Sequence, residues 1–332
     1  MGLGCLITGG CGFIGTSLVR KLLQYNRYHP IRIVDNMSVG TFSELEKICE
    51  YEIVTINDFQ NKIASTSKVQ LIVADILDTE LMIKAAENID VVIHLAANTG
   101  VVPSIKDPMA DCMINIKGTL NVLEACRINN VSKFVFASSG ASIGAVTPPI
   151  HEELVPHPVS PYGASKLAGE AYCSAYFRSF GIKAIALRFS NVYGPGSKHK
   201  TSVVAKFIKH ALSGLPLEIY GDGKQTRDFI YIDDLVDAIE KTVQSDNIGG
   251  EIFQIATQRE TTINELADTI LSLLRENGIP SVQIMCADER KGDVLRNYSD
   301  TQKAAKFIGW QAKINIKEGL SKTLEWYMAS EK

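Results

Sequence analysis

The chain has 332 residues, of which 45% are hydrophobic and 21% are charged, and these values exclude a disordered, collagen-like or coiled-coil protein. Lysine and arginine number 34 against 37 acidic residues, so the net charge of −3 argues against a broad nucleic-acid-binding face. The seven cysteines form no CxxC pair, the six histidines lack metal-ligand spacing, and no apolar run approaches the ~20 residues of a membrane span. We therefore expect a cytoplasmic protein with reduced thiols, no metal, and no membrane or nucleic-acid partner.

In the first half of the chain, short runs rich in β-branched residues alternate with helix-like segments. This alternation predicts an α/β fold, a doubly wound parallel sheet covered by helices on both faces. The expected strands are Cys5–Thr8, Ile31–Asp35, Val69–Ala74, Val91–Leu95, Phe134–Ser138 and Ile182–Phe189. The expected helices are Phe13–Tyr25, Thr79–Glu87, Asp111–Asn129 and a segment from Tyr162 through Ser179, and Asn57–Lys68 is interpreted as a surface excursion.

The pattern becomes less regular from about Asn191, where helices and short strands mix. The change predicts a smaller mixed α/β C-terminal domain for the substrate. We expect domains at 1–190 and 191–332, with residues around 228–245 returning to the first domain.

A glycine-rich segment, Thr8–Gly15, joins the first expected strand to the first helix. Its glycines allow the backbone to approach a pyrophosphate at the positive N-terminus of that helix. Asp35 ends the second strand 20 residues after Gly15, where a carboxylate binds a ribose 2′-hydroxyl and repels a 2′-phosphate. No basic residue follows in Asn36–Ser38, so the segment predicts a Rossmann-type domain that binds NAD in preference to NADP. The alternative is a tight strand–helix turn without a ligand.

Two further strand ends fit the same cofactor. Asp75 and Ile76 close the third strand, where a carboxylate can meet the adenine amino group. The small residues of Leu95–Ala97 follow the fourth strand and leave room beside a dinucleotide. His94 itself is interpreted as a core histidine with satisfied hydrogen bonds.

Tyr162 and Lys166 are spaced i, i+4 in a helical pattern, which places phenol and ammonium on one face. A nearby cation favours the phenolate, as a general base requires. About one such pair is expected by chance, and a second one, Tyr220 and Lys224, lies among helix-breaking glycines. The first pair follows a strand that ends Ala137–Ser139, whose hydroxyl groups complete a Ser–Tyr–Lys set. The alternative for these serines is polar capping of a strand end.

Together with Asn115, these motifs resemble the extended short-chain dehydrogenase/reductases. The segments Leu187–Pro195, Gly221–Phe229 and Arg290–Asp293 are similar to the nucleotide-sugar epimerase/dehydratase branch of that family. The resemblance spans nearly the whole chain, and the motifs follow the family's order.

The resemblance implies that Tyr162 is the base, that Lys166 binds the nicotinamide ribose and tunes Tyr162, and that Ser139 binds the reacting sugar hydroxyl. The implied cofactor-binding residues are Gly9, Gly12, Phe13, Ile14, Gly15, Asp35, Asn36, Ser38, Asp75, Ile76, Leu95, Ala96, Ala97, Asn115, Tyr162 and Lys166. The implied substrate-binding residues are Ser139, Asn191, Tyr220, Arg227, Arg290, Asp293 and Asn297. Arg227 and Arg290 suit a diphosphate because guanidinium groups bind phosphate bidentately. The alternative for both arginines is a surface or inter-domain salt bridge. The family also implies a homodimer through the helices Asp111–Asn129 and Tyr162–Phe180.

The residues after Ser139 bear on the reaction. Gly140-Ala141-Ser142 contains no carboxylate, whereas the 4,6-dehydratases of the family carry acidic residues there; Ser142-Ile143-Gly144 also departs from the common Val-Tyr-Gly ending of the epimerases. We predict an NAD-dependent UDP-sugar 4-epimerase that forms a transient 4-keto sugar and supplies nucleotide sugars for surface polysaccharide or glycan synthesis. The alternatives are a nucleotide-sugar reductase or atypical dehydratase, and a non-catalytic cofactor-sensing protein.

Asn297 bears on the choice of sugar. In the resembled family the matching position lines the sugar pocket, where a bulky Tyr goes with plain hexoses and smaller residues go with N-acetyl sugars. Asn297 therefore predicts that UDP-N-acetylglucosamine is accepted. The alternative is that Asn297 caps a turn and that Ser142 or the loop Ser197–Ser202 shapes the pocket.

Overall fold

The computed structural model describes residues 2–55, 58, 67–288 and 294–330. The chain divides into two compact units: unit 1 comprises Met1–Gly144, Val155–Arg188 and Ala238–Phe253, and unit 2 comprises Ala145–Leu154, Phe189–Asp237 and Gln254–Lys332. Most of the expected excursion Asn57–Lys68 lies outside the described residues, as do Arg290 and Asp293. The assignment of residues 1–190 to the cofactor and 191–332 to the substrate stays a prediction.

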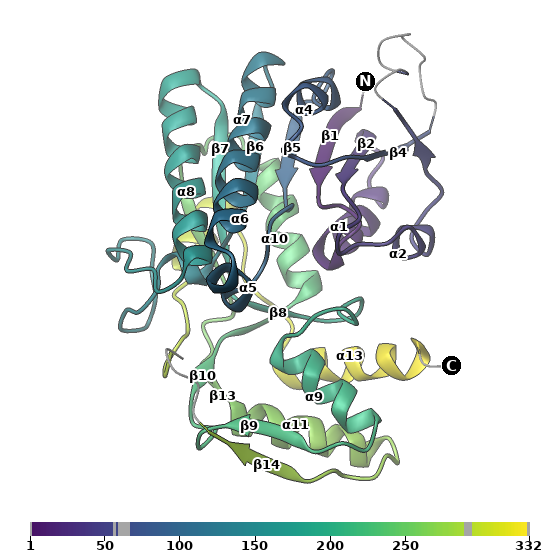
Figure 1. The fold of residues 1–332 in the computed structure, drawn as a ribbon, viewed down its shortest axis with the longest axis vertical. Coiled ribbons are helices and arrows are strands. Elements are labelled where there is room, and N and C mark those ends of the chain that lie inside the picture. Colours follow the sequence, from purple (N-terminus) through teal and green to yellow (C-terminus); the bar gives the residue numbers. More distant parts are fainter. Residues whose placement is uncertain (1, 56–57, 59–66, 289–293, 331–332) are drawn as a thin grey trace. The chain divides into compact units, whose positions relative to one another are not determined.

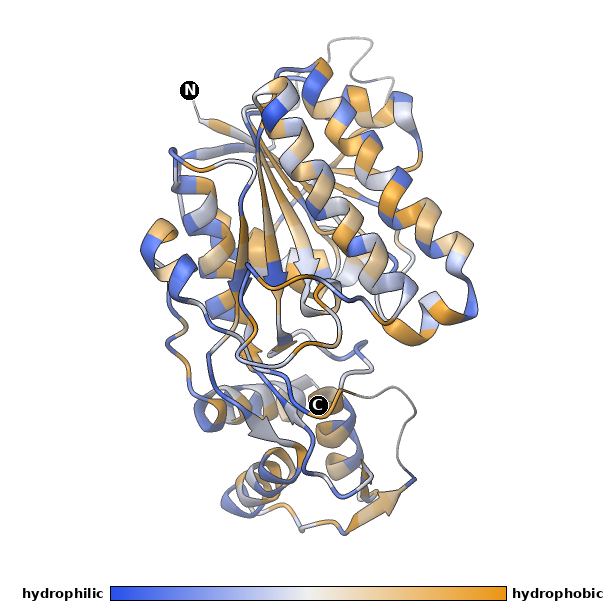
Figure 2. Ribbon diagram, turned by 90° about the vertical axis from the view of Figure 1, so that its left-hand side faces the viewer, coloured by the Kyte–Doolittle hydropathy of each residue, from blue (hydrophilic) through white to orange (hydrophobic). Residues whose placement is uncertain are grey.

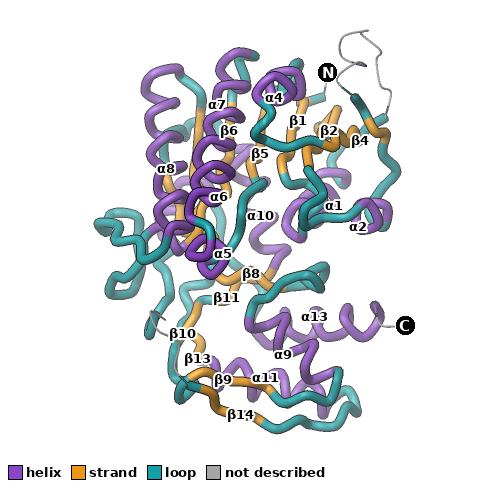
Figure 3. Tube along the Cα trace, viewed as in Figure 1, coloured by secondary structure: helices purple, strands orange, loops and turns teal. Residues whose placement is uncertain are grey.

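Among the described residues, eight strands form one sheet in the order β12-β7-β6-β5-β1-β2-β4-β3 (Figures 1 and 3). The central strand β1 (Leu3–Thr8) pairs in parallel with β2 (Tyr28–Asp35) and with β5 (Val91–His94), so that Ile7 lies opposite Ile33 on one side and Ile93 on the other. The strands β2, β4 and β3 lie on one side of β1, and the later strands β5, β6, β7 and β12 lie on the other side. This order confirms the predicted doubly wound, Rossmann-type sheet.

The remaining elements follow in chain order. In unit 1 they are α1 (Phe13–Leu23), α2 (Phe42–Glu46), β3 (Glu52–Ile53), β4 (Val69–Val73), α4 (Thr79–Ala85), α5 (Val101–Lys106), α6 (Pro108–Cys112), a π-helical turn (Met113–Lys117), α7 (Gly118–Ile128), β6 (Lys133–Ser139), a 3₁₀ turn (Gly140–Ser142), α8 (Pro161–Phe180) and β7 (Lys183–Phe189). In unit 2 they are β8 (Asn191–Tyr193), α9 (Val203–Leu212), β9 (Leu217–Tyr220), β10 (Thr226–Arg227), β11 (Phe229–Tyr231), β13 (Thr261–Thr262), α11 (Ile263–Glu276), β14 (Ile284–Ala287), α12 (Gln302–Ile308) and α13 (Ile316–Ser330). Helix α10 (Ile232–Gln244) and strand β12 (Ile252–Ile255) cross from one unit to the other.

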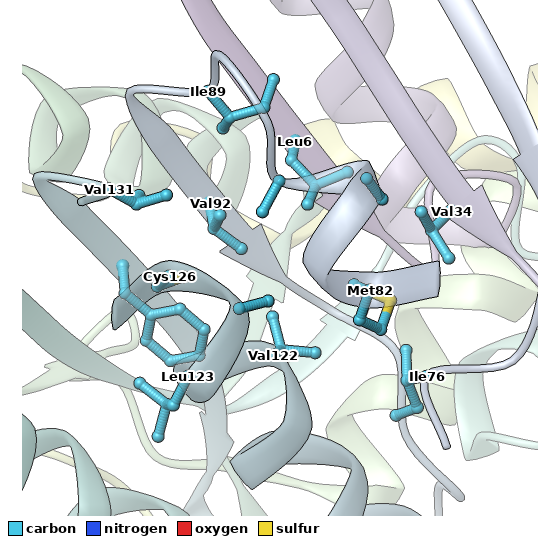
Figure 4. Packing of buried hydrophobic residues seen from close by; sticks show 14 of the residues in the cluster. Leu6, Val34, Ile76, Met82, Ile89, Val92, Val122, Leu123, Cys126 and Val131 are labelled. Carbon is cyan, nitrogen blue, oxygen red and sulfur yellow. The ribbon is translucent and has the colours of Figure 1, made fainter. Parts of the chain in front are cut away.

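Both faces of the large sheet are buried, which explains the continuous apolar runs of its strands. On one face, Leu6, Val34 and Val92 pack with Met82 of α4 and Val122 of α7 (Figure 4). Helix α1 packs along β2 with buried residues Leu18, Val19 and Leu22, and helices lie on both sides of the sheet in Figure 2. Each fully buried Leu, Ile or Val side chain contributes about 1.5–3 kcal/mol, so this packing fixes the strands that carry the site.

The expected helix Asp111–Asn129 is wrong in one respect, because the chain forms α6, a π-helical turn and α7 in succession. The helical segment also starts earlier, since the Asp107 carboxylate accepts a hydrogen bond from the Ala110 N–H at 2.9 Å and Pro108 occupies the first position. The π-helical turn adds a residue to the repeat, and such turns occur often at functional sites. Asn115 lies in this turn.

Unit 2 consists of short paired strands and helices, as expected for a mixed α/β region. Its strand pairs are β8 with β11, β9 with β14, and β10 with β13. Trp310 is fully buried and donates its indole N–H to the Asp234 carbonyl at 2.9 Å, while the Asp234 carboxylate accepts from the Lys313 and Ile314 N–H groups. These bonds fasten the segment before α13 to the start of α10.

In the described part of the chain, no helix combines the length and the apolar character that crossing a membrane requires. The same residues contain no group of three or more His, Cys, Asp or Glu side chains placed to hold a metal ion.

Candidate active site

The loop between β1 and α1 packs closely against the backbone that follows β5 and against the start of α1. Gly9 has a φ of +71°, and a Cβ there would lie 2.8 Å from the Ala96 nitrogen. A Cβ on Gly15 would lie 2.4 Å from the Gly9 carbonyl oxygen, whereas one on Gly12 would meet nothing closer than 3.4 Å. The first turn of α1 has no side-chain cap at Gly12. The loop therefore brings backbone close to a helix N-terminus that suits an anion.

Asp35 lies beside this loop, at the end of β2. Its carboxylate accepts hydrogen bonds from the Cys11 N–H and from the Met37 N–H, both at 2.9 Å, and it is 8% exposed. Burial raises the pKa of Asp35, and the two backbone N–H groups oppose that rise. The acid is thereby tied to the turn that carries the glycines.

The neighbouring strand ends supply the other cofactor candidates. Asn36 donates to the Asp75 carboxylate at 2.8 Å and accepts from the Ser38 N–H at 3.1 Å, so the ends of β2 and β4 are linked. Ile76 is buried, while Leu95, Ala96 and Ala97 are half-buried after β5. These candidates therefore lie on unit 1 at the carboxyl ends of neighbouring parallel strands.

His94 is a core histidine, as expected. Its Nδ1 lies 2.7 Å from the Thr8 hydroxyl, and its Nε2 lies 3.0 Å from the Thr119 hydroxyl. The ring stacks on Phe136, with centroids 6.0 Å apart. Burial lowers the pKa of His94 to about 3, and nearby Lys166 also lowers it, so the ring is neutral at physiological pH.

Tyr162 occupies the first turn of α8. The Ser160 hydroxyl caps this helix by accepting from the Gly163 N–H at 3.1 Å, and Pro161 is its first residue. The side chain of Ser139, at the end of β6, hydrogen-bonds the Tyr162 phenol. Burial raises the pKa of Tyr162 to about 12, and the bond from Ser139 opposes that rise.

Lys166 lies one helical turn further along α8. Its Nζ donates to the Ala137 carbonyl at 2.8 Å and lies 5.9 Å from the centroid of the Tyr162 ring. Burial lowers the pKa of Lys166 to about 8, while Asp111 and Glu170 oppose that fall. The structure thus brings Ser139, Tyr162 and Lys166 together on unit 1.

Ser138 has a different role from its neighbour. Its hydroxyl donates to Oε1 of Glu170, as does the Ser142 hydroxyl at 2.7 Å. Arg188 binds the same carboxylate with two bonds of 2.8 Å, and both charged side chains are 1% exposed. This buried ion pair was not predicted from the sequence, although Glu170 follows Lys166 by four residues and Arg188 interrupts an apolar strand.

Three substrate candidates of unit 2 converge on the segment Thr226–Asp228. The Asn191 amide donates to the Asp228 carbonyl at 3.2 Å, and the Asn297 N–H donates to the Thr226 hydroxyl at 3.1 Å. Arg227 donates to the Thr226 and Val294 carbonyls at 2.7 and 2.6 Å. Tyr220 ends β9, where its phenol donates to Glu218 at 2.7 Å.

Asp228 joins these segments and was also missed. It is fully buried and accepts from the Thr257 N–H at 2.8 Å, from the Thr257 hydroxyl at 2.6 Å and from the Ser299 N–H at 3.4 Å. The sequence does carry a signal for Asp228, because this acidic residue lies between Arg227 and the apolar run Phe229–Ile232.

Comparison with known proteins gives the wider context. The sequence profile of a family described as the NAD dependent epimerase/dehydratase family matches residues 5–256. A UDP-glucose 4-epimerase of Mycolicibacterium smegmatis is 33% identical over 97% of both chains. A crystal structure of UDP-glucose 4-epimerase with UDP-glucose from Thermotoga maritima is 32% identical, with a TM-score of 0.87 over 99% of this chain and 100% of that chain.

A third relative is named for a different sugar. The UDP-N-acetylglucosamine 4-epimerase of Methanobrevibacter ruminantium, solved in complex with UDP-N-acetylmuramic acid, is 29% identical, with a TM-score of 0.87 over 99% of both chains. The match of the family profile and the identity over almost the full length agree. The chain belongs to the NAD dependent epimerase/dehydratase family, whose enzymes use NAD.

Proposed function

We propose that this protein is a UDP-sugar 4-epimerase, an isomerase that inverts C4 through a transient 4-keto sugar. One observation carries the proposal: Ser139, Tyr162 and Lys166 come together, while the turn Gly140–Ser142 after Ser139 has no carboxylate. A dehydration needs an additional acid and base to remove water, whereas an epimerisation returns the same proton and the same hydride. The side chains of this site suit the second reaction.

The proton is handled by Tyr162. In the first half of the reaction its phenolate takes the proton of the sugar 4-hydroxyl, and in the second half its phenol returns that proton to the 4-oxygen. Ser139 donates a hydrogen bond that stabilises the phenolate. The Lys166 ammonium, 5.9 Å from the centroid of the Tyr162 ring, would add a positive charge beside it. When bound, NAD supplies a reversible acceptor for the hydride of C4. The proton balance therefore closes within the site.

The glycine loop and Asp35 would hold NAD. The uncapped start of α1 suits the pyrophosphate, and the Asp35 carboxylate, fixed by the Cys11 and Met37 N–H groups, suits the two hydroxyl groups of the adenine ribose. A 2′-phosphate would meet the same negative charge, which is why we propose NAD rather than NADP. Lys166 would bind the nicotinamide ribose.

The nucleoside diphosphate would be held by Asn191, Tyr220 and Arg227, together with Arg290 and Asp293 outside the described residues. Arg227 is anchored by two carbonyl groups, which fixes its guanidinium for bidentate binding of phosphate. We propose that Asn297, half-buried on the segment that Thr226 holds, admits an N-acetyl sugar.

We further propose a homodimer through α7 and α8. The outward face of α8 exposes Ala164, Ala171 and Ala175, small residues that allow close packing. Beside it, Met113 and Ile128 are 40% and 47% exposed. The proposal includes a cytoplasmic location, which the free cysteines support, and a supply of nucleotide sugars for surface polysaccharide or glycan synthesis.

The test incubates the purified holoprotein with UDP-glucose, UDP-galactose, UDP-N-acetylglucosamine and UDP-glucuronate and separates the products by chromatography. We expect C4 epimers without consumption of added NADH. Tyr162→Phe should lower turnover ~10²–10⁴-fold, while Tyr172→Phe on the same helix serves as the matched control. A stable keto sugar, net oxidation of NADH or near-normal activity of Tyr162→Phe would reject the proposal.

A further inference from the structure

A buried carboxylate lies under the catalytic helix and has no part in the proposed proton transfer. Asp111 belongs to α6, which packs against α8, and it is 1% exposed. Its Oδ1 accepts a hydrogen bond of 2.9 Å from the Asn115 amide. An ionised carboxylate in such a place is costly unless it is hydrogen-bonded or serves nearby charges.

Asn115 links this carboxylate to the base. Its amide nitrogen also lies 3.0 Å from the Asn98 carbonyl and 3.2 Å from the Ser165 hydroxyl, and its Oδ1 accepts from the Asn98 N–H at 2.8 Å. The Ser165 hydroxyl in turn donates to the Tyr162 carbonyl at 3.0 Å. The chain of bonds thus joins the loop after β5 to the first turn of α8.

The charge of Asp111 also acts on Tyr162 and Lys166, which are called the pair below. It disfavours loss of the proton from Tyr162 and favours the ammonium of Lys166. The other groups facing Lys166 are Glu170, the Cys173 thiol and neutral His94. The other charged groups on the elements around α6 are exposed: Lys106 of α5, Lys117 of the π-helical turn, Asp107 before α6 and Arg178 of α8. Glu170 of α8 is buried but is paired with Arg188.

We propose that Asp111 is a positioning residue for Tyr162 and Lys166: its buried carboxylate fixes Asn115, which is hydrogen-bonded through Ser165 to the turn of α8 that carries Tyr162. Its negative charge also favours the ammonium form of Lys166, whose pKa burial lowers. This inference rests on the proposed role of Tyr162 as the base. It assigns Asp111 no contact with substrate or cofactor.

Asp111→Asn removes the charge and keeps an oxygen that can accept from Asn115. The pair then loses its first proton more easily, whichever of the two residues releases it. We expect the acidic limb of the pH profile of kcat/KM to move down by about 0.5–1 pH unit, with the plateau changed less than about threefold. Asp111→Thr, also neutral and able to accept a hydrogen bond, should move the limb in the same direction.

The matched control is Asp107→Asn, four residues earlier. Asp107 is exposed and caps α6, a role that asparagine fills equally well, so this variant should leave the pH profile unchanged. An acidic limb that stays in place in both Asp111 variants, or that moves as far in Asp107→Asn, would overturn the proposal.

A second readout does not depend on turnover. Tyrosines labelled with ¹³C at Cζ report their own titration by NMR in the NAD-loaded protein, and Tyr162→Phe identifies the signal of Tyr162. We expect this signal to titrate at a lower pH in Asp111→Asn than in the wild type. If no UDP-sugar is epimerised but the signal moves, the proposed function fails and the role of Asp111 stands; an unmoved signal rejects that role.

Discussion

The buried polar side chains around Tyr162 fall into two groups. Ser139 and Lys166 lie against the phenol, one as a hydrogen-bond donor and the other as a cation. Asn115 and Glu170 do not contact the phenol. Asn115 donates to the Ser165 hydroxyl, and Glu170 accepts from the Ser138 hydroxyl beside Ser139. Substitutions in the first group should therefore change the chemical step, and those in the second group should change geometry or stability.

Asn297 offers a test of substrate choice at the level of one residue. If its small side chain admits an acetamido group, the wild type converts UDP-N-acetylglucosamine, and Asn297→Tyr should lower kcat/KM for that sugar at least tenfold relative to UDP-glucose. A steric overlap of ~1.4 kcal/mol is enough for a tenfold change. The measurement compares kcat/KM for both sugars in the two proteins.

Asn297→Ser is the control, because serine is also small and should preserve the ratio. A wild type that converts plain hexoses alone, or an unchanged ratio in Asn297→Tyr, would show that the sugar is selected elsewhere.

The adjacent serines of β6 illustrate what the sequence could and could not decide. Side chains alternate along a strand, so Ser138 shares the face of Phe134 and Phe136, which pack beneath the helices, and Ser139 does not. That alternation was visible in the sequence. The partner of Ser138 was not, because Glu170 and Arg188 meet through the packing of α8 on the sheet.

At the scale of elements, the Glu170–Arg188 pair joins α8 to β7, and Ser138 and Ser142 join it to β6 and the following turn. Arg188→Met would leave the Glu170 carboxylate buried without its cation. We expect the free energy of unfolding to fall by about 3–5 kcal/mol, measured by urea denaturation.

Lys84→Met is the control: it breaks the half-exposed ion pair between Lys84 of α4 and Glu87, which follows that helix, and we expect little change. Equal effects of the two substitutions would contradict a structural role for the buried pair.

The buried strands of unit 1 could be predicted because each is a continuous apolar run, and α1 because its buried residues form one apolar stripe. The π-helical turn could not, since an amphipathic pattern does not distinguish one inserted residue from a regular helix. The start of α6 could have been predicted from Asp107 and Pro108, because an aspartate followed by a proline is typical of a helix N-terminus. Strand β3 has two exposed residues, too few for a pattern.

At the scale of the molecule, the proposed homodimer depends on the small outward face of α8. Ala171→Arg places a long charged side chain on that face and should convert a dimer into a monomer, measured by size-exclusion chromatography with light scattering. Ala329→Arg, at an exposed position of α13, should leave the mass unchanged. A monomeric wild type, or a dimer that tolerates Ala171→Arg, would contradict the proposed interface.

The central claim is that C4 loses and regains the same hydrogen while Tyr162 carries the hydroxyl proton. The most direct test follows UDP-[4-²H]glucose by NMR in ordinary water, with the purified protein and no added NAD. The account predicts UDP-galactose that keeps its deuterium at C4, with no exchange into solvent and no accumulating ketone. Loss of the deuterium to water, or release of a stable 4-keto sugar, would contradict it.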